Sequence, residues 1–330
     1  MRSARLSLAL ETGALTLPAS GRIAVYGPRR DDDLSMLPRD RLVALTGFKP
    51  DYDHFAAMCS VTPAPPYAAT IVCLPRSREA ARALIARAAA EVAPGGWIAV
   101  DGQKTDGIDS ALKDLGRRVD LSESLSKAHG KLATFPAGSD LSDWAARPAV
   151  VAGFRTLPGI FSADGPDPAS ALLAATLPAK LGGKVADLGA GWGFLAAEIL
   201  KRPGVKRLDL VEAEAVALDC ARANITDPRA RFHWADATVW RPETLLDAVV
   251  MNPPFHTGRA ANPALGAAFI RAARRMLAPD GSLWLVANRH LPYDPVLADC
   301  FLEVREAAGD SRFRVIHATK PRRDPSRAKP

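Results

Sequence analysis

The chain has 330 residues, enough for about two compact domains, each with its own hydrophobic core. Hydrophobic residues make up 48% and charged residues 24%, which excludes wholesale disorder, and the lack of any run of about 18 uncharged apolar residues predicts no membrane-spanning helix. The net charge of +7 is uneven, because residues 311–330 hold seven basic side chains and one acidic one.

The N-terminal residues combine a basic start with an apolar stretch, as a signal peptide does, but Glu11 interrupts that stretch. We therefore expect a cytoplasmic protein. The four cysteines form no CxxC pair and the six histidines form no HxxxH or HxH cluster, so we expect reduced thiols and no metal site.

Two segments of the first half resemble two segments of the second half. Residues 70–75 (TIVCLP) mirror residues 249–254 (VVMNPP), and residues 89–102 (AAEVAPGGWIAVDG) align with residues 275–288 (RMLAPDGSLWLVAN). The second pair shares a helix end, a Pro-Gly turn and an apolar strand. Since both segments occur in the same order, the sequence predicts a duplicated domain.

The first copy lacks the residues that carry chemistry in the second copy. It places Leu74 and Pro75 where the second has Asn252 and Pro253, and it contains no acidic glycine loop. We therefore expect a degenerate domain over residues 1–145 and a catalytic domain over residues 146–330. The boundary falls in the polar, turn-forming stretch at residues 140–148.

From residue 146 onward, strand-like and helix-like segments alternate, which predicts a mostly parallel sheet covered by helices. We expect strands at residues 185–188, 207–211, 231–234, 246–251 and 282–287, and helices at residues 194–201, 213–224 and 265–277. Residues 302–307 and 312–318 are separated by too few residues for a parallel crossover, so we expect a final antiparallel hairpin. The fold class is α/β, with two Rossmann-like domains in tandem.

The segment VADLGAGWG, residues 185–193, is a strand that ends in Asp187 and runs into a glycine loop. Gly189 and Gly191 allow a sharp turn and close approach of a ligand. The spacing differs from the GxGxxG dinucleotide fingerprint. An acidic residue before the loop holds a positive amino group and repels a pyrophosphate, which favours S-adenosylmethionine over NAD.

Two further carboxylates follow neighbouring strands. Glu212 ends the second strand, where a carboxylate accepts both hydroxyl protons of a ribose. Asp236 follows the third strand and is placed to accept a proton from the adenine amino group, or else to cap a helix or a turn.

The fourth strand ends in Asn252-Pro253-Pro254-Phe255-His256, at the edge of the sheet that carries the glycine loop. Two consecutive prolines make a stiff turn that presents carbonyl oxygens. The Asn252 side-chain oxygen and the Pro253 carbonyl can hold both N–H groups of an aromatic amine and stabilise the positive charge that develops on its nitrogen during methyl transfer. Phe255 offers a face for base stacking.

The last twenty residues carry the excess positive charge, contributed by Arg312, Arg314, Lys320, Arg322, Arg323, Arg327 and Lys329. Such a segment is typical of contact with a polyanion such as RNA, or of a solubilising end.

Together these motifs resemble the class I S-adenosylmethionine-dependent methyltransferases, and among them the bacterial ribosomal RNA guanine-N2 methyltransferases, most closely the small-subunit (16S) branch. The resemblance covers nearly all of residues 150–323. It rests on PGIFS with DG at 158–165, DLGAG at 187–191, NPPFH with Gly258, VAN with LPY at 286–293, and the basic residues 312–323.

The resemblance implies a catalytically silent first domain and the cofactor S-adenosylmethionine. It assigns cofactor binding to Asp187, Gly189, Gly191, Glu212, Asp236 and Asn252. It assigns the orientation of the guanine amine to Asn252, Pro253 and Phe255. Further substrate contacts are assigned to Phe161, Ser162, Pro254, His256, Arg322 and Arg323. Trp192 and Phe194 depart from the small residues usual in this loop, and they either pack beneath it or contact the cofactor.

The expected partner is ribosomal RNA or the small ribosomal subunit. Three alternatives stay open: a large-subunit RNA guanine, another planar amine such as adenine N6 or a glutamine side chain, and a non-catalytic RNA-binding assembly factor. Phe255 favours guanine, because relatives that methylate the other amines more often carry Tyr there. The intact Asn252 argues against loss of catalysis.

Overall fold

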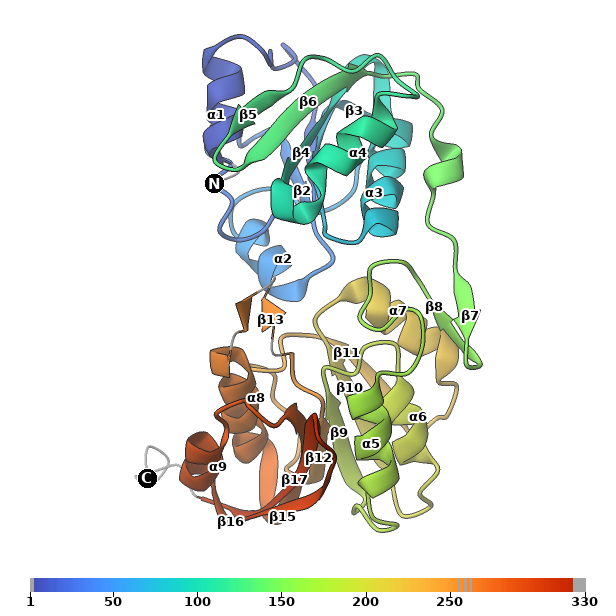
Figure 1. Cartoon of the computed structure of the whole chain (residues 1–330), viewed down its shortest axis with the longest axis vertical. Coiled ribbons are helices and arrows are strands. Elements are labelled where there is room, and N and C mark those ends of the chain that lie inside the picture. Colours follow the sequence, from blue (N-terminus) through green and yellow to red (C-terminus); the bar gives the residue numbers. More distant parts are fainter. Residues whose placement is uncertain (1–2, 255, 258–259, 262, 323–330) are drawn as a thin grey trace. The chain divides into compact units, whose positions relative to one another are not determined.

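The computed structural model describes residues 3–254, 256–257, 260–261 and 263–322. The chain divides into two compact units (Figure 1). The first comprises Met1–Pro148 and Leu157–Gly159, and the second comprises Ala149–Thr156 and Ile160–Pro330. The division at Pro148 lies at the end of the stretch in which the sequence places the boundary.

In the first unit, helices cover both faces of a six-stranded sheet of order β2-β1-β3-β4-β6-β5 (Figure 1). The neighbours β2, β1, β3 and β4 are parallel, and β5 and β6 are antiparallel additions. The strands are β1 (Ile23–Tyr26), β2 (Leu42–Leu45), β3 (Tyr67–Cys73), β4 (Val92–Gln103), β5 (Leu125–Lys127) and β6 (Gly130–Pro136). The helices are α1 (Ser3–Glu11), α2 (Lys49–Ala56), α3 (Arg78–Glu91), η1 (Lys104–Asp106), α4 (Ile108–Leu115) and η2 (Ser142–Trp144).

The second unit contains a seven-stranded sheet of order β11-β10-β9-β12-β15-β17-β16, in which β17 is antiparallel to both neighbours. Its strands are β9 (Lys184–Leu188), β10 (Arg207–Glu212), β11 (Ala230–Trp234), β12 (Leu246–Met251), β15 (Leu277–Asn288), β16 (Phe301–Gly309) and β17 (Phe313–Pro321). Two hairpins, β7 (Ala149–Val151) with β8 (Phe154–Thr156) and β13 (His256–Thr257) with β14 (Ala260–Ala261), lie outside this sheet. The helices are α5 (Pro168–Thr176), α6 (Phe194–Leu200), α7 (Ala215–Asn224), α8 (Pro263–Met276) and α9 (Asp294–Cys300).

Side chains of the second sheet alternate between two apolar layers. Val185 packs with α5, α6 and α7, whereas Ala186 packs with α8 and α9. Along β15, Trp284 belongs to the first layer and Leu285 to the second. Successive residues of a strand point to opposite faces, so a nearly continuous apolar strand is buried on both sides.

The strands and helices that the sequence predicts in the second unit are all present, and the terminal hairpin is antiparallel as expected. Helices α5 and α9 were not predicted. Both are short, and α5 is almost wholly apolar, so neither shows the periodicity of a long amphipathic helix. Strand β15 begins five residues earlier than predicted and passes through the Pro-Gly turn with a shift of register against β12.

The duplication is visible in the pairing of the strands. Helix α3 and strand β4 have the same lengths as α8 and β15, and the register of β4 against β3 shifts at the same place as that of β15 against β12. The first sheet has no counterpart of β11. The tandem arrangement of two Rossmann-like domains is therefore confirmed.

The structure corrects the details of the sequence alignment. Val92 is equivalent to Leu277, so the alignment of residues 89–102 with 275–288 is wrong by one residue. The strand pairing confirms the match of residues 70–75 with residues 249–254, which puts Cys73 at the position of Asn252; the placement of Leu74 there is wrong. The apolar strands are buried on both faces, so they lack the alternation that fixes a register in a sequence.

All four cysteines are free thiols; Cys73, Cys220 and Cys300 are buried and Cys59 is half-buried. Among the helices in the described part of the chain, none is both long and apolar enough to cross a membrane.

Candidate active site

The order of the second sheet reverses between β9 and β12, and ligands of open α/β sheets bind beyond the carboxyl ends of strands at such a point. Val250 of β12 pairs with Asp187 of β9, so the glycine loop and the Asn-Pro-Pro turn leave neighbouring strands at the same edge. The structure therefore brings these two predicted motifs together.

The loop after β9 is anchored to β10. The N–H groups of Gly189 and Ala190 both donate to the carbonyl of Val211, at 2.8 and 3.2 Å. Gly189 and Gly191 have φ angles of +75° and +55°, which a residue with a Cβ rarely adopts. A Cβ at Gly191 would meet no atom within 4 Å, so the space beside this backbone is open to a ligand.

The carboxyl group of Asp187 is fully buried, and among the described residues neither of its oxygens has a hydrogen-bond partner. Burial, reinforced by the nearby charge of Glu212, raises its pKa to about 8. The backbone N–H of Ala196 opposes this shift, but its contact falls short of a hydrogen bond. A buried carboxylate without a partner favours a cationic ligand, because an unpaired buried charge is costly.

The carboxylate of Glu212 is held by backbone amides on two sides. One oxygen accepts from the N–H of Gly191 and the other from the N–H of Glu214, both at 2.8 Å. Burial raises the pKa of Glu212, and these backbone hydrogen bonds oppose the increase. Each oxygen has further acceptor capacity, so the group can also bind a diol.

Asp236 follows β11 and forms a local turn. Its Oδ1 accepts from both the backbone N–H and the hydroxyl of Thr238, at 2.8 and 2.7 Å. These bonds correspond to the capping alternative that the sequence left open. They use one carboxylate oxygen, and a carboxylate has two.

The side chain of Asn252 is fixed by two residues that the sequence analysis missed. Its Nδ2 donates to Oδ2 of Asp167 and to the hydroxyl of Ser170, each at 2.9 Å. Asp167 is the N-cap of α5 and also accepts from the backbone N–H of Ser170. Both N–H groups of the Asn252 amide are thereby occupied, which leaves its oxygen as an acceptor. The sequence Asp167-Pro168 is a typical helix start, the one signal that pointed to this region.

The rest of the Asn-Pro-Pro turn is described in part. Pro253 is buried and Pro254 is exposed. His256 begins β13, and the predicted stacking residue, Phe255, lies outside the described residues.

The predicted substrate contacts Phe161 and Ser162 lie in a strained, accessible loop. The side chain of Phe161 is 62% exposed, and Ser162 has a φ angle of +54°. The indole N–H of Trp192 donates to the Phe161 carbonyl at 3.1 Å. The indole ring itself is buried against Phe154 and Phe194, so the two bulky rings of the glycine loop pack against each other beneath it.

The basic C-terminal segment is less free than its composition suggests. Arg314 is largely buried and pairs with Asp294 at 2.8 Å, and Lys320 pairs with Glu303. The guanidinium of Arg322 donates to the carbonyl of Ala298 at 3.0 Å. Arg323 lies outside the described residues. Part of the positive charge therefore belongs to β17 and is paired there, next to the edge strand β16.

Within the described residues, no group of three or more His, Cys, Asp and Glu side chains is arranged to hold a metal ion. The unpaired Asp187, the open Gly191 and the acceptors of Glu212 instead fit an organic cation that carries a ribose. The sheet order, its antiparallel seventh strand and this loop define a class I methyltransferase.

Comparison with known proteins specifies the family. The methyltransferase small domain family matches residues 152–317. The chain is 32% identical over 268 residues to ribosomal RNA small subunit methyltransferase C of Pseudomonas aeruginosa, covering 77% of this chain and 80% of that protein. It is 33% identical over 234 residues to the Klebsiella pneumoniae protein of the same name, covering 69% and 68%. The chain therefore belongs to the family of the ribosomal RNA small subunit methyltransferase C.

A solved structure agrees with the two-domain fold. The T. thermophilus 16S rRNA N2 methyltransferase RsmC, in complex with AdoMet and guanosine, superposes with a TM-score of 0.77 at 23% sequence identity. The match covers 92% of this chain and 90% of that one, so both units are included.

Proposed function

We propose that this chain transfers a methyl group from S-adenosylmethionine to the exocyclic N2 amine of a guanine in 16S ribosomal RNA. The observation that carries the proposal is the fixed amide of Asn252, whose oxygen is left as an acceptor beside the glycine loop. The family membership and the names of the relatives support the choice of 16S RNA.

S-adenosylmethionine supplies an electrophilic methyl group when it is bound. Asp187 would hold its amino group, Glu212 its ribose hydroxyls and Asp236 its adenine amine, with Gly189 and Gly191 giving the backbone room to approach. The buried, unpartnered carboxyl of Asp187 and the open side of Gly191 support these assignments.

The chain then orients the nucleophile. The Asn252 oxygen and the Pro253 carbonyl would accept the two N–H groups of the guanine amine, which draws the nitrogen lone pair out of the ring system. The same two oxygens stabilise the positive charge on nitrogen in the transition state. No general base is needed before attack, because a proton leaves the nitrogen only after it becomes cationic. Phe255, Phe161, Ser162, Pro254 and His256 complete the substrate site that we propose.

The partner that we propose is ribosomal RNA or the small ribosomal subunit, and the place of action is the cytoplasm, where ribosomes assemble. A paired and stacked guanine hides its amine, so the enzyme acts on an exposed or flipped base.

The test is transfer of labelled methyl groups to small subunits from cells that lack this protein, followed by nucleoside analysis of the digested RNA. We expect label in N2-methylguanosine of 16S RNA. Label in another nucleoside or in protein would still demonstrate methyltransferase activity, but it would overturn the assignment of guanine as the substrate. Binding of the cofactor without transfer to any substrate would favour an assembly factor.

A further inference from the structure

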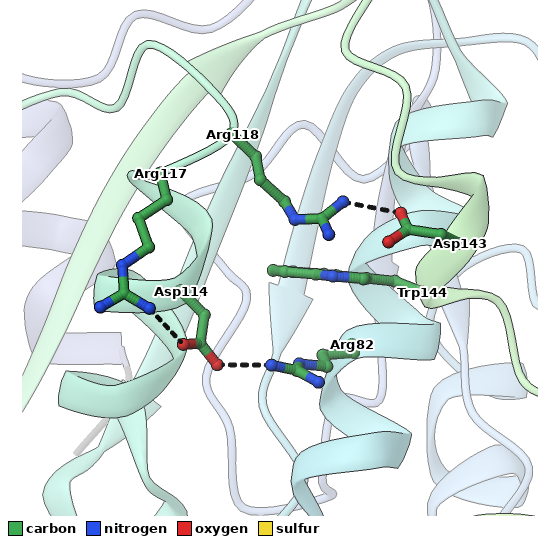
Figure 2. A pocket seen from close by; sticks show the side chains of 6 residues that line it. All are labelled: Arg82, Asp114, Arg117, Arg118, Asp143 and Trp144. Atoms are coloured by element: carbon green, nitrogen blue, oxygen red, sulfur yellow. Dashed lines mark hydrogen bonds and ion pairs between the residues drawn. The ribbon is translucent and has the colours of Figure 1, made fainter.

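Five arginine side chains gather on the first unit, where α3, the end of α4 and η2 meet. Arg78 and Arg82 lie one turn apart on α3, Arg117 and Arg118 follow α4, and Arg76 precedes α3. Figure 2 shows the cavity that Arg82, Arg117 and Arg118 of this arginine cluster line, with a volume of about 320 Å³. Carboxylates lie among these arginines: Asp106, Asp114 and Asp143 form ion pairs with them, and the charges of Glu79 and Asp140 act on Arg78 and Arg118.

Three of the arginines share one carboxylate. Arg78 and Arg82 approach Oδ2 of Asp114 at 2.6 and 2.8 Å, and Arg117 approaches Oδ1 at 3.8 Å. Hydrogen bonds from Arg78 and Arg82 lower the pKa of Asp114, so the group stays ionised and holds them in place. Asp114 is 13% exposed, whereas Arg78 and Arg117 are 56% and 68% exposed. The anion is therefore shielded, and the solvent meets guanidinium groups.

Two further residues, Trp144 and Asp143, hold arginines of the cluster in place. The ring of Trp144 lies between the guanidiniums of Arg82 and Arg118, each 5.2 Å from a ring centroid (Figure 2). Asp143 holds Arg118 at 2.7 Å. Side chains fixed in this way lose little conformational freedom when they bind a ligand.

We propose that this arginine cluster binds the phosphodiester backbone of the RNA substrate, an inference that rests on the proposed function. Guanidinium groups present planar N–H donors that match phosphate oxygens, and exposed guanidiniums around a shielded carboxylate can attract a polyanion. The cavity lining contains no histidine, cysteine or hydroxyl side chain, so its residues suit binding rather than chemistry. The first unit thereby contributes RNA affinity to the methyl transfer that we assign to the second.

The test measures binding of 16S RNA to the full chain as a function of salt concentration. In Arg78→Gln/Arg117→Gln we expect about tenfold weaker binding at 100 mM salt and a slope of log affinity against log salt that is reduced by about one to two. The matched control, Arg22→Gln/Lys127→Gln, removes two exposed cations elsewhere in the same unit and should bind within about twofold of the parent chain.

A second variant separates charge from structure. Asp114→Asn disturbs the same ion pairs but adds net positive charge, so we expect it to bind RNA about two- to threefold more tightly. If the cluster only stabilises the fold, both cluster variants lower the melting temperature and neither changes RNA affinity, which would overturn the inference.

Methyl transfer distinguishes this inference from the proposed function. We expect the double arginine variant to raise the KM for RNA about tenfold while kcat and the affinity for S-adenosylmethionine stay unchanged. Transfer by the parent chain with no effect of the cluster variants on RNA binding would refute the inference alone. Cluster-dependent RNA binding without any transfer would refute the proposed function alone.

Discussion

At the scale of single residues, the site depends on polar groups whose other partners are already fixed. Backbone amides hold Glu212, and Asp167 and Ser170 occupy the N–H groups of Asn252. Asp187 is the opposite case, since it is buried and has no hydrogen-bond partner in the part of the chain that the structure describes. Preorganised acceptors cost nothing to orient during the reaction, whereas an unpaired carboxyl gains most when a cation arrives.

We predict that Asn252→Ala lowers kcat by at least about a hundredfold, because it removes one of two acceptors at the nucleophile. The affinity for S-adenosylmethionine should change by less than about threefold, since the glycine loop is untouched. Single-turnover transfer and calorimetric cofactor binding measure the two quantities. Equal losses in both would identify the turn as structural.

Asp187 makes cofactor affinity depend on pH. Its pKa of about 8 means that the free protein is mostly protonated at this group below pH 8, whereas an ammonium ligand favours the ionised form. Binding therefore releases a proton, and affinity should increase by up to about tenfold per pH unit between pH 5.5 and 7.5. Calorimetry in buffers of different ionisation enthalpy measures the proton. Asp187→Asn should bind more weakly and without this slope, and an unchanged slope in that variant would assign the titration to another group.

The raised pKa of Asp187 also makes the stability of the folded protein depend on pH. A carboxyl whose pKa is raised in the folded state contributes stability below its unfolded value of 3.8, and that contribution disappears as the pH rises to about 8. The cofactor-free protein should therefore gain more from Asp187→Asn at pH 8 than at pH 5, which thermal unfolding at the two pH values measures.

At the scale of helices and strands, the start of α5 positions the Asn-Pro-Pro turn, and α8 packs closely against the segment after β15. Helix α5 begins at Asp167, and the same carboxylate caps the helix and holds Asn252. On the other face of the sheet, Gly266 of α8 packs directly against the buried ring of Tyr293. Both contacts join segments that are far apart in the sequence.

Asp167→Ser separates the two roles of Asp167. Serine retains the N-cap of α5 but is too short to reach Asn252, so the helix should persist while the amide loses one partner. We expect kcat to decrease by about tenfold, with cofactor affinity and melting temperature nearly unchanged. A variant that melts earlier and binds the cofactor poorly would show that Asp167 serves the fold alone.

Gly266→Ala tests the close contact between α8 and the segment after β15. A Cβ at this position would overlap the phenol group of Tyr293, which is fully buried, so the ring or the helix has to shift. We expect destabilisation by about 1–3 kcal/mol, measured by urea unfolding. Tyr293→Phe should restore part of the loss by removing the hydroxyl, whereas Gly204→Ala, where a Cβ would meet nothing, serves as a neutral control. Equal stability of both alanine variants would contradict the packing argument.

At the scale of the whole molecule, the two units share a strand order and differ in the side chains at equivalent positions. The strand pairing places Val25 and Cys73 in the first unit at the positions of Asp187 and Asn252 in the second. We infer that the first unit lost its methyltransferase chemistry when these polar groups became apolar or thiol side chains, while its surface acquired the arginine cluster. On our proposals, one chain combines an RNA-binding surface and a transfer site.

We expect the basic C-terminal end to take part in RNA binding as well. Lys320 pairs with Glu303 in β16 and Pro321 completes β17, so a deletion after Thr319 would damage the sheet edge. Deletion after Arg322 instead removes Arg323, Arg327 and Lys329 and leaves the strand whole. We expect about threefold to tenfold weaker RNA binding with a shallower salt dependence, measured by filter binding between 50 and 200 mM salt. An unchanged slope would exclude this end from RNA contact.

The sequence alone predicted the seven strands of the second sheet and three of the five helices of the second unit, and it pointed to the two motifs that the structure brings together. The motifs are the glycines at 189 and 191, the acidic residue before them and the Asn-Pro-Pro turn. Few other residues can meet the chemical requirements at these positions, so the motifs can be recognised in the sequence alone. The duplication could also be recognised from the sequence, because turns and strand ends repeat in the same order in both halves.

Only the tertiary structure decided how these parts are supported. The register between the two copies, the partners Asp167 and Ser170 of Asn252, the pairing of Arg314 and the arginine cluster around Asp114 all depend on contacts between residues distant in sequence. Such contacts leave no periodic or local signal, because a polar residue at a helix end or a surface arginine is compatible with many partners until the chain folds.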